Sequence, residues 1–163
     1  MRRWRVAGGV IDGPDGVLLV RNRRRNGSHD WSTPGGVIDE GEEAVGALTR
    51  EVAEETGLVV PDWRGPIYDV DVEAPDLGWH LTVEVFSAPF PGGDIAIDDP
   101  DGIVVEAGWY SAERCGQLLA GTQRWVSEPL VSFLGERWDD RRWFRYLVEG
   151  DRLADLRVHA VEP

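Results

Sequence analysis

The sequence holds one cysteine, no lysine and no long unbroken run of apolar residues. With Cys115 as its single thiol, the chain cannot form an intramolecular disulfide, and a reduced cytosolic setting is the default for such a protein. The lack of a long apolar run argues against a membrane-spanning helix, and Asp12 and Asp15 interrupt the stretch that a secretory signal would need. We therefore expect a cytoplasmic protein with no membrane partner. We attribute the absence of lysine to the codon bias of a GC-rich genome and infer no mechanism from it.

Positive charge is scarce as well. The 17 basic residues face 30 acidic ones, which leaves a formal net charge of −13. Such a chain is a poor candidate for binding long nucleic acid, because that binding depends on neutralising phosphates. A small phosphate-bearing substrate remains open if metal ions bridge it to carboxylates. We expect a small-molecule nucleotide as the partner and a monomer or homodimer as the assembly.

The length of 163 residues and the hydrophobic content of 42% predict a single domain over residues 1–163 with a real core. Within it we expect a central part over about residues 1–135 and a C-terminal extension over about 136–163. The patterns of apolar and turn residues predict strands over 3–12, 17–21, 67–73, 79–87 and 103–110, and helices over 42–56, 111–119 and 123–134. Strands before and after a helix, with further helices late in the chain, favour an α/β protein with a mixed sheet covered on two faces.

The last part of the chain is expected to form a β-hairpin. Apolar and polar residues alternate over 143–148 and again over 154–160, on either side of Glu149, Gly150 and Asp151. A hairpin of this kind has one apolar face, which must pack on something. It suits a dimer interface or a lid, and it suits packing within the chain best.

The helix over 42–56 carries two kinds of side chain. Val45, Leu48 and Val52 are expected to form its apolar stripe, and Gly57 is a suitable residue to end it. Three carboxylates border that stripe, and their spacing of three or four residues places them on one face. Like charges so placed destabilise a helix, and a hard divalent cation with oxygen ligands would offset the repulsion. The three are Glu51, Glu54 and Glu55.

These carboxylates belong to a longer pattern, which reads Gly36-x5-Glu42-x7-Arg50-Glu51-Val52-x-Glu54-Glu55-x-Gly57-Leu58. The pattern matches the signature of the Nudix (MutT-like) pyrophosphohydrolases at every defined position, so the chain resembles that family. The resemblance implies an α/β/α sandwich in which this signature, the Nudix box, forms a loop-helix-loop at the mouth of the active site. A plain solvated helix face would account for the acids alone, but not for the glycines and the arginine at matching offsets.

The resemblance also implies roles for the residues of the box. Glu51, Glu54 and Glu55 would hold Mg²⁺ or Mn²⁺, helped by the main-chain carbonyl of Gly35. Bound metal would bridge phosphate oxygens and activate a water for attack on phosphorus. The supporting residues would be Arg50, which holds the glutamates, with Glu42, Gly36 and Gly57.

Two alternatives exist for the general base. In some relatives it is the first glutamate of the box cluster, here Glu51; in others it is an acid from a later loop. The later candidates in this chain are Glu106, Asp98, Asp99 and Asp101. We favour Glu51, with Glu106 as an assisting ligand.

Substrate contacts are expected from arginines and tryptophans outside the box. One or two of four arginines are candidates for phosphate contacts, because an arginine side chain matches phosphate oxygens, although a soluble loop would also carry them. The four are Arg21, Arg23, Arg24 and Arg25, of which we favour Arg21 and Arg23. Trp31, Tyr68 and Trp79 offer faces on which a base can stack, although packing is the commoner use of such residues. We favour the two tryptophans, Trp31 first. The three histidines, His29, His80 and His159, lack the spacing of metal ligands.

The resemblance implies metal-dependent hydrolysis of a pyrophosphate bond in a nucleoside diphosphate-linked compound. We favour a nucleoside triphosphate, including an oxidised one, which would give the monophosphate and diphosphate. ADP-ribose or a nucleotide sugar is the alternative substrate. A non-catalytic nucleotide-sensing domain is the alternative of another class, but such domains usually lose box residues, and here the box is intact.

Overall fold

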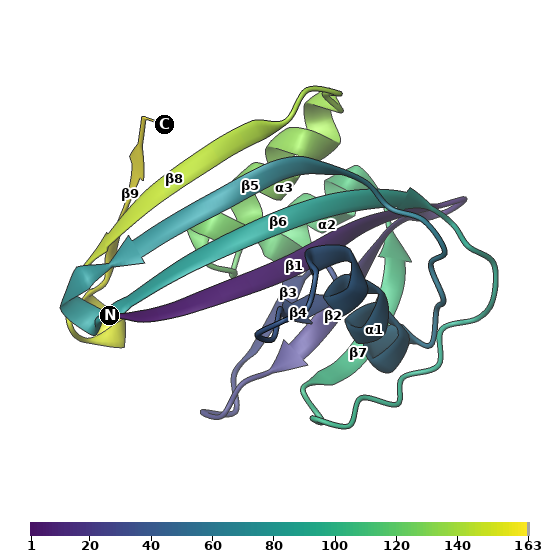
Figure 1. The fold of residues 1–163 in the computed structure, drawn as a ribbon, viewed down its shortest axis with the longest axis horizontal. Coiled ribbons are helices and arrows are strands. Elements are labelled where there is room, and N and C mark those ends of the chain that lie inside the picture. Colours follow the sequence, from purple (N-terminus) through teal and green to yellow (C-terminus); the bar gives the residue numbers. More distant parts are fainter. Residues whose placement is uncertain (163) are drawn as a thin grey trace.

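The computed structural model describes residues 1–162, and its strands form one mixed sheet of nine strands (Figure 1). The strands are β1 Arg2–Gly13, β2 Gly16–Arg23, β3 His29–Ser32, β4 Gly35–Val37, β5 Arg64–Ala74, β6 Trp79–Pro89, β7 Val104–Tyr110, β8 Arg142–Glu149 and β9 Arg157–Val161. The helices are α1 Ala44–Thr56, α2 Ala112–Leu119 and α3 Arg124–Glu136, with 3₁₀ turns at Pro75–Leu77 and Leu153–Asp155. In the part of the chain described, none of the helices is long and apolar enough to cross a membrane.

The sheet divides where β1 and β2 diverge. The path of paired strands runs β3-β2-β1-β6-β5-β8-β9, but β1 and β2 pair only near the turn that joins them, at Asp12 with Val17 and Gly13 with Gly16. Nearer its start, β1 pairs instead with the short strand β4, where Gly8 lies opposite Gly35. We call β1, β6, β5, β8 and β9 the long wing, and β2, β3 and β7 the short wing (Figure 1). The box therefore enters the fold at the point where the two wings separate.

Helices cover both faces of the sheet. In Figure 1, α1 lies in front of the strands, and α2 and α3 lie behind them. One core cluster joins α2 and α3 to the long wing and includes Leu119, Leu130 and Phe133. A second cluster joins α1 to the strands and includes Leu48 and Val52. The predicted α/β/α arrangement with a mixed sheet is confirmed.

The predicted C-terminal hairpin is present and extends the long wing. β8 runs parallel to β5, and β9 runs antiparallel to β8. Tyr146 and Val148 are buried against the core, whereas Trp143 on the other face is 51% exposed. The hairpin thus packs within the chain, which is the use that its single apolar face favoured.

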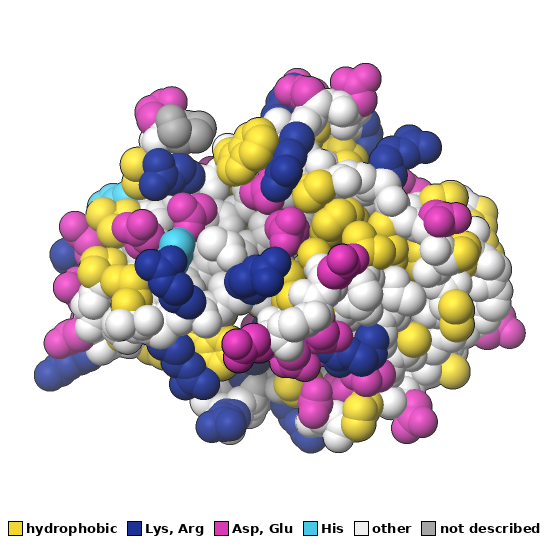
Figure 2. All heavy atoms as spheres, viewed as in Figure 1, with side chains coloured by type: hydrophobic (Ala, Val, Ile, Leu, Met, Phe, Trp, Pro, Cys, Tyr) yellow, Lys and Arg dark blue, Asp and Glu magenta, His cyan; other side chains and the backbone are white. Residues whose placement is uncertain are grey.

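The face of the long wing that α2 and α3 leave open carries charges of both signs (Figure 2). Neighbouring strands are joined there by ion pairs, among them Arg141 with Asp69 at 2.6 Å and Arg145 with Asp71 at 3.6 Å. Charged side chains on this face remain in contact with water, so this part of the sheet needs no further helix.

The apolar stripe of α1 differs from the prediction. Val45 is 40% exposed, while Ala47, Leu48 and Val52 are fully buried. The helix begins at Ala44, and residues four apart from that start, Ala44, Leu48 and Val52, share the inward face. Val45 lies one position further round the helix and faces outward.

Leu48→Ala and Val45→Ala distinguish the two versions of the stripe. Loss of the buried leucine side chain is expected to lower the free energy of unfolding by about 2–5 kcal/mol. Loss of the exposed valine side chain should change it by about 0.5 kcal/mol or less. Urea denaturation measures both; equal losses would contradict the burial of α1 described above.

Candidate active site

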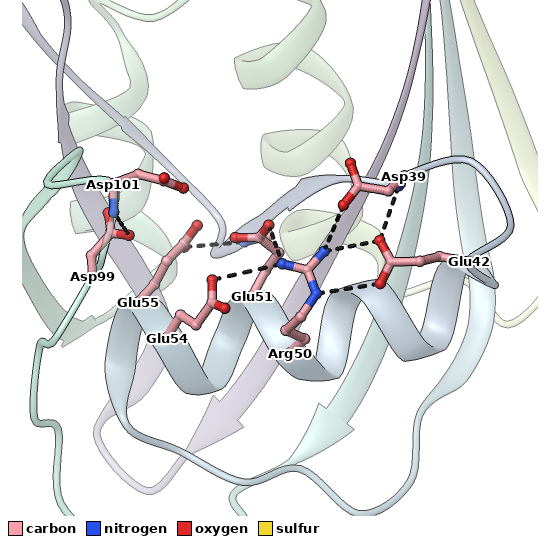
Figure 3. Close-up of polar contacts among 9 residues, drawn as sticks. Asp39, Glu42, Arg50, Glu51, Glu54, Glu55, Asp99 and Asp101 are labelled. Carbon is pink, nitrogen blue, oxygen red and sulfur yellow. Dashed lines mark hydrogen bonds and ion pairs between the residues drawn. The ribbon is translucent and has the colours of Figure 1, made fainter.

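The box carboxylates project from one side of α1 toward β4 and the loop between β6 and β7 (Figure 3). Glu55 is the most enclosed, at 8% exposure, and its Oε2 accepts a hydrogen bond from the Gly35 N–H at 3.2 Å. The side chain of Glu51 is 13% exposed and that of Glu54 is 31% exposed. The three acids of this helix thus differ in solvent exposure, which increases from Glu55 to Glu51 to Glu54.

Arg50 connects these acids to the loop before the helix. Its Nε and Nη2 donate to both carboxylate oxygens of Glu42, at 3.3 and 2.9 Å. Its Nη1 donates to Glu51 at 3.0 Å and lies 3.7 Å from an oxygen of Glu54. The hydrogen bonds from Arg50, then that from the Asp39 N–H, lower the pKa of Glu42. The contacts expected of Arg50 and Glu42 are present (Figure 3).

The two glycines before the helix meet different constraints. A Cβ on Gly36 would lie 2.4 Å from the Cδ of Glu51, so the absence of a side chain leaves room for that carboxylate. A Cβ on Gly35 would lie 2.1 Å from the main-chain oxygen of Ala7, and Gly35 has a φ of 152°. Gly36 therefore makes room for a box acid, and Gly35 allows β4 to pack against β1. Gly57 ends the helix in the left-handed conformation, with a φ of 77°.

Negative charge exceeds positive charge around these acids. Burial raises the pKa of Glu55 to about 8; the Gly35 N–H opposes the shift, and repulsion from Glu51, Asp99 and Glu54 adds to it. Burial also raises the pKa of Glu51, against the opposing effect of Arg50. Oxygen ligands with unmet negative charge are the donor set that Mg²⁺ and Mn²⁺ prefer, so the residues present fit a divalent cation.

A cavity of about 620 Å³ opens beside the box and extends between the long wing and α3. Its walls carry the carboxylates of Asp39, Glu51, Glu55, Asp99 and Asp101 and the guanidinium groups of Arg24 and Arg50 at one end. Toward α3 the walls are apolar and include Val70, Leu81, Val83, Trp125 and Leu130. A second hollow of about 530 Å³, beside Asp12, Trp63 and Arg64, contains no residue of the box.

The later acids divide between the cavity and the outer surface. Asp99 and Asp101 line the cavity, whereas Glu106 and Asp98 do not. Glu106 lies on β7 opposite Arg21, with 3.6 Å between their charged groups. The carboxylate of Asp99 accepts hydrogen bonds from three main-chain N–H groups, those of Asp101, Ile103 and Val104. Asp99 therefore shapes the loop that brings Asp101 to the cavity.

The predicted substrate residues lie around the cavity and not on its wall. Trp31 packs edge-on against Tyr110, with 5.3 Å between ring centres, and Trp79 packs edge-on against Trp125 at 6.1 Å. Arg21 is paired with Glu106, and Arg23 is exposed. A role in substrate binding stays a prediction for all four, and the tryptophans have the packing role that is commoner for their type.

The cavity wall includes Arg24 and Tyr68, which the sequence offered as candidates without favouring them, and Asn22 and Trp125, which sequence reasoning missed. Arg24 lies on the wall and donates two hydrogen bonds to Asp30, at 2.6 and 2.8 Å. Asn22 is only 6% exposed, and its Nδ2 donates to Asp30 at 3.1 Å and to Ser32 at 2.9 Å. A polar residue that directly continues an apolar strand was the available signal for Asn22. Trp125 gave no such signal.

One other group of metal-ligand types is gathered by the fold. Ligand atoms of Asp71, Glu73 and His80 lie within 4.8 Å of one another, which is tighter than the spread of the box acids. However, the Nδ1 of His80 faces the guanidinium of Arg3, a group that only donates. The Nδ1 of His80 is therefore the acceptor of this contact. Its Nε2 carries the hydrogen and donates a hydrogen bond to the carboxylate of Asp71. With Arg145 beside Asp71, this group is an ion-pair cluster of the open sheet face.

Comparison with known proteins agrees with this geometry. The profile of the NUDIX domain matches residues 2–132. The chain belongs to the Nudix family. It is 46% identical over 140 residues to an RNA pyrophosphohydrolase of Caulobacter vibrioides. That alignment covers 77% of this chain and 81% of that protein. It is 34% identical over 97 residues to an 8-oxo-dGDP phosphatase of Mus musculus, covering 59% of this chain and 28% of that protein.

Among solved structures, this Nudix chain resembles a MutT Nudix hydrolase from Burkholderia pseudomallei. The TM-score is 0.61 at 25% identity, and the match covers 69% of this chain and 86% of that one. The chain spans only 24% and 28% of the length of two curated relatives that it matches, the mouse protein being the second.

Substitution of Gly36 should weaken metal binding, whereas substitution of Gly35 should lower stability. In Gly36→Ala the new Cβ displaces only the flexible Glu51 side chain, so the melting temperature should stay near that of wild type while Mg²⁺ affinity falls by about 10- to 100-fold. In Gly35→Ala the Cβ meets backbone, so the melting temperature should fall. Calorimetric Mg²⁺ titration and thermal unfolding test the pair. Unchanged Mg²⁺ affinity in Gly36→Ala would remove Glu51 from the metal ligands.

The raised pKa of Glu55 predicts a pH dependence with a definite sign. The folded protein holds this proton up to about pH 8, whereas an unperturbed glutamate releases it near 4.5. The contribution of Glu55 to the stability of the metal-free protein is therefore full below about pH 4.5 and is lost progressively up to about pH 8. The neutral variant Glu55→Gln should accordingly gain stability relative to wild type across that range.

The same shift predicts proton release when Mg²⁺ binds at pH 7, because a carboxylate ligand must be ionised. Calorimetry in two buffers of different ionisation enthalpy measures that proton. Glu55→Gln should release fewer protons, whereas Glu40→Gln, which alters an exposed acid of the loop before α1, should behave as wild type. Equal proton release by all three proteins would contradict the assignment.

Proposed function

We propose that this Nudix protein hydrolyses a pyrophosphate bond in a nucleoside diphosphate-linked small molecule, using Mg²⁺ or Mn²⁺. The observation that carries the proposal is the placement of an intact box at the mouth of the cavity, with Glu51 and Glu55 on its wall. Arg50 holds Glu51, and the Gly35 N–H bonds Glu55. Glu51, Glu54 and Glu55, with the carbonyl of Gly35, are the proposed ligands. Bound metal would neutralise phosphate charge and lower the pKa of an attacking water.

The protein's own residues supply positioning and proton transfer. Arg50 keeps Glu51 and Glu54 on the cavity side of α1 through its contacts at 3.0 and 3.7 Å. Glu51 is the proposed general base, because it lines the cavity and is partly enclosed. We assign the assisting role to Asp101 in place of Glu106, since Asp101 lines the cavity and Glu106 does not.

A nucleoside triphosphate is the substrate that we favour, with the monophosphate and diphosphate as products. A phosphate chain suits the metal end of the cavity, and a flat base suits its apolar end. The name of the mouse relative indicates action on an oxidised guanine nucleotide, which supports a nucleotide of this class. ADP-ribose and nucleotide sugars present the same bond and are the alternative.

RNA with a 5′-triphosphate is a second candidate, because the Caulobacter relative is named an RNA pyrophosphohydrolase and aligns over most of both chains. The net charge of −13 argues against it, as do the five carboxylates that face two guanidinium groups in the cavity. A mononucleotide brings fewer phosphates to this acidic surface than a polymer does.

A substrate panel tests these proposals. With Mg²⁺ present, pyrophosphate or monophosphate products are measured from nucleoside triphosphates, ADP-ribose and a 5′-triphosphate RNA oligonucleotide. We expect turnover of a nucleoside triphosphate, and its loss on addition of a chelator. Glu54→Gln should lower kcat by at least about 100-fold, since a metal-site contribution is worth several kcal/mol.

Glu40→Gln is the matched control, because it removes one acid near the same helix but outside the cavity lining. Equal rates for Glu54→Gln and wild type would refute the metal site. Nucleotide binding without turnover of any substrate would favour a sensing domain, and preference for the RNA would favour the second candidate.

A further inference from the structure

Tyr68 on β5 is a buried tyrosine whose hydroxyl has no partner within residues 1–162. The residue is 4% exposed and lines the cavity. In the same range, every side-chain nitrogen or oxygen that is wholly shut off from solvent has a hydrogen-bond partner. The unpaired hydroxyl of Tyr68 is therefore open to the cavity. Buried tyrosine hydroxyls usually find a protein partner, so this one is left for a group that enters the cavity.

The ring of Tyr68 is held firmly from behind. Phe133, Trp138 and Phe144 surround it, with ring centres 6.3, 6.2 and 5.9 Å away. Burial raises the pKa of its hydroxyl, which keeps the group neutral and able both to donate and to accept. A fixed ring with one unpaired polar atom presents that atom at a defined position.

The strand register sets the distance between Tyr68 and the box. Across the floor of the cavity, Gly35 lies opposite Gly8, Gly8 opposite Val85, and Val85 opposite Tyr68. These are three steps between neighbouring strands, or roughly 14 Å at the usual strand spacing. A diphosphate and a pentose can bridge that span, so the group attached to the sugar would arrive at Tyr68.

The walls near Tyr68 select the chemistry of that group. Val70, Leu81, Val83 and Leu130 surround this end, together with the ring of Trp125. A second sugar would place several hydroxyls against these aliphatic side chains without partners, which is costly. A flat ring with a polar edge satisfies both the apolar walls and the single hydroxyl.

From these contacts we propose that the end of the cavity between β5, β6 and α3 binds the nucleobase of the substrate, and that the Tyr68 hydroxyl forms a hydrogen bond with the edge of the base. This inference rests on the proposed function for the direction in which the substrate lies. It makes Tyr68 a residue that determines specificity, with no part in the chemistry at phosphorus.

Tyr68→Phe tests the inference, with Tyr146→Phe as the matched control. Tyr146 is equally buried, at 3% exposure, but its hydroxyl donates to Glu128 at 3.1 Å, and it does not line the cavity. Loss of that internal bond should lower the melting temperature of Tyr146→Phe by roughly 2–4 °C. Tyr68→Phe should melt at or above the wild-type temperature, because it removes a hydroxyl that bonds nothing in the protein. A fall equal to that of Tyr146→Phe would overturn the inference.

Binding supplies the second readout and does not depend on turnover. The four common nucleoside monophosphates and ribose 5-phosphate are titrated into the Mg²⁺-loaded proteins. Tyr68→Phe should weaken binding of the preferred nucleotide by about 3- to 10-fold, as loss of one hydrogen bond does, and leave ribose 5-phosphate unchanged. Tyr146→Phe should bind all five as wild type does.

The outcomes separate this inference from the proposed function. Equal affinity of wild type and Tyr68→Phe for every nucleotide would overturn the inference, even if wild type hydrolyses nucleoside triphosphates. Wild type that binds no nucleoside monophosphate more tightly than ribose 5-phosphate would overturn it too. Base-dependent binding that Tyr68→Phe weakens, in a protein that hydrolyses no nucleotide, would support the subsite and refute the proposed reaction.

Discussion

Arg50 is the group on which the arrangement of the box acids depends. Its Nε and Nη2 donate two hydrogen bonds to Glu42. Its Nη1 contacts the carboxylates of Glu51 and Glu54. One guanidinium cannot neutralise this many carboxylates, and Glu55, which it does not contact, holds its proton to about pH 8. The site is therefore ordered but short of positive charge. In the proposed function, that imbalance is what would let a strongly acidic protein recruit a phosphate compound, since a cation that satisfied the acids would also attract the phosphates.

The separation of β1 from β2 turns this charged helix face into a site. Insertion of β4 into the gap brings Gly35 and Gly36 against α1, and the cavity follows the floor formed by β4, β1, β6 and β5. The polar end of the cavity therefore lies over β4, and its apolar end lies over β5, three strands away across the same floor. A sheet that remained paired along the whole of β1 and β2 would have no room for β4, the strand that carries Gly35 and Gly36.

The spacing of residues within the sequence predicted the local parts of this site well. Arg50 and Glu42 are eight residues apart, and the geometry of a helix with its preceding loop brings them together. Predictions that depended on which way a side chain faces within its strand or helix were weaker. Glu106 was expected at the site, but its strand turns it to the outer face beside Arg21, and Val45 was expected in the core although α1 faces it outward. Tyr68 was one of three aromatic residues considered for a base contact, and the sequence favoured Trp31. Only strand register and an unpaired hydroxyl distinguish Tyr68 as the one on the cavity wall.

The aromatic cluster behind Tyr68 gives the C-terminal segment influence over the far end of the cavity. Trp138 precedes β8 and Phe144 lies within it, and both pack on the Tyr68 ring. Changes in this segment would move the far wall of the cavity and leave the carboxylates of α1 where they are. The two ends of the cavity are thus built from separate stretches of chain. Substitutions in the C-terminal segment would therefore change which group the far end of the cavity accommodates, while the sequence of α1 stays the same.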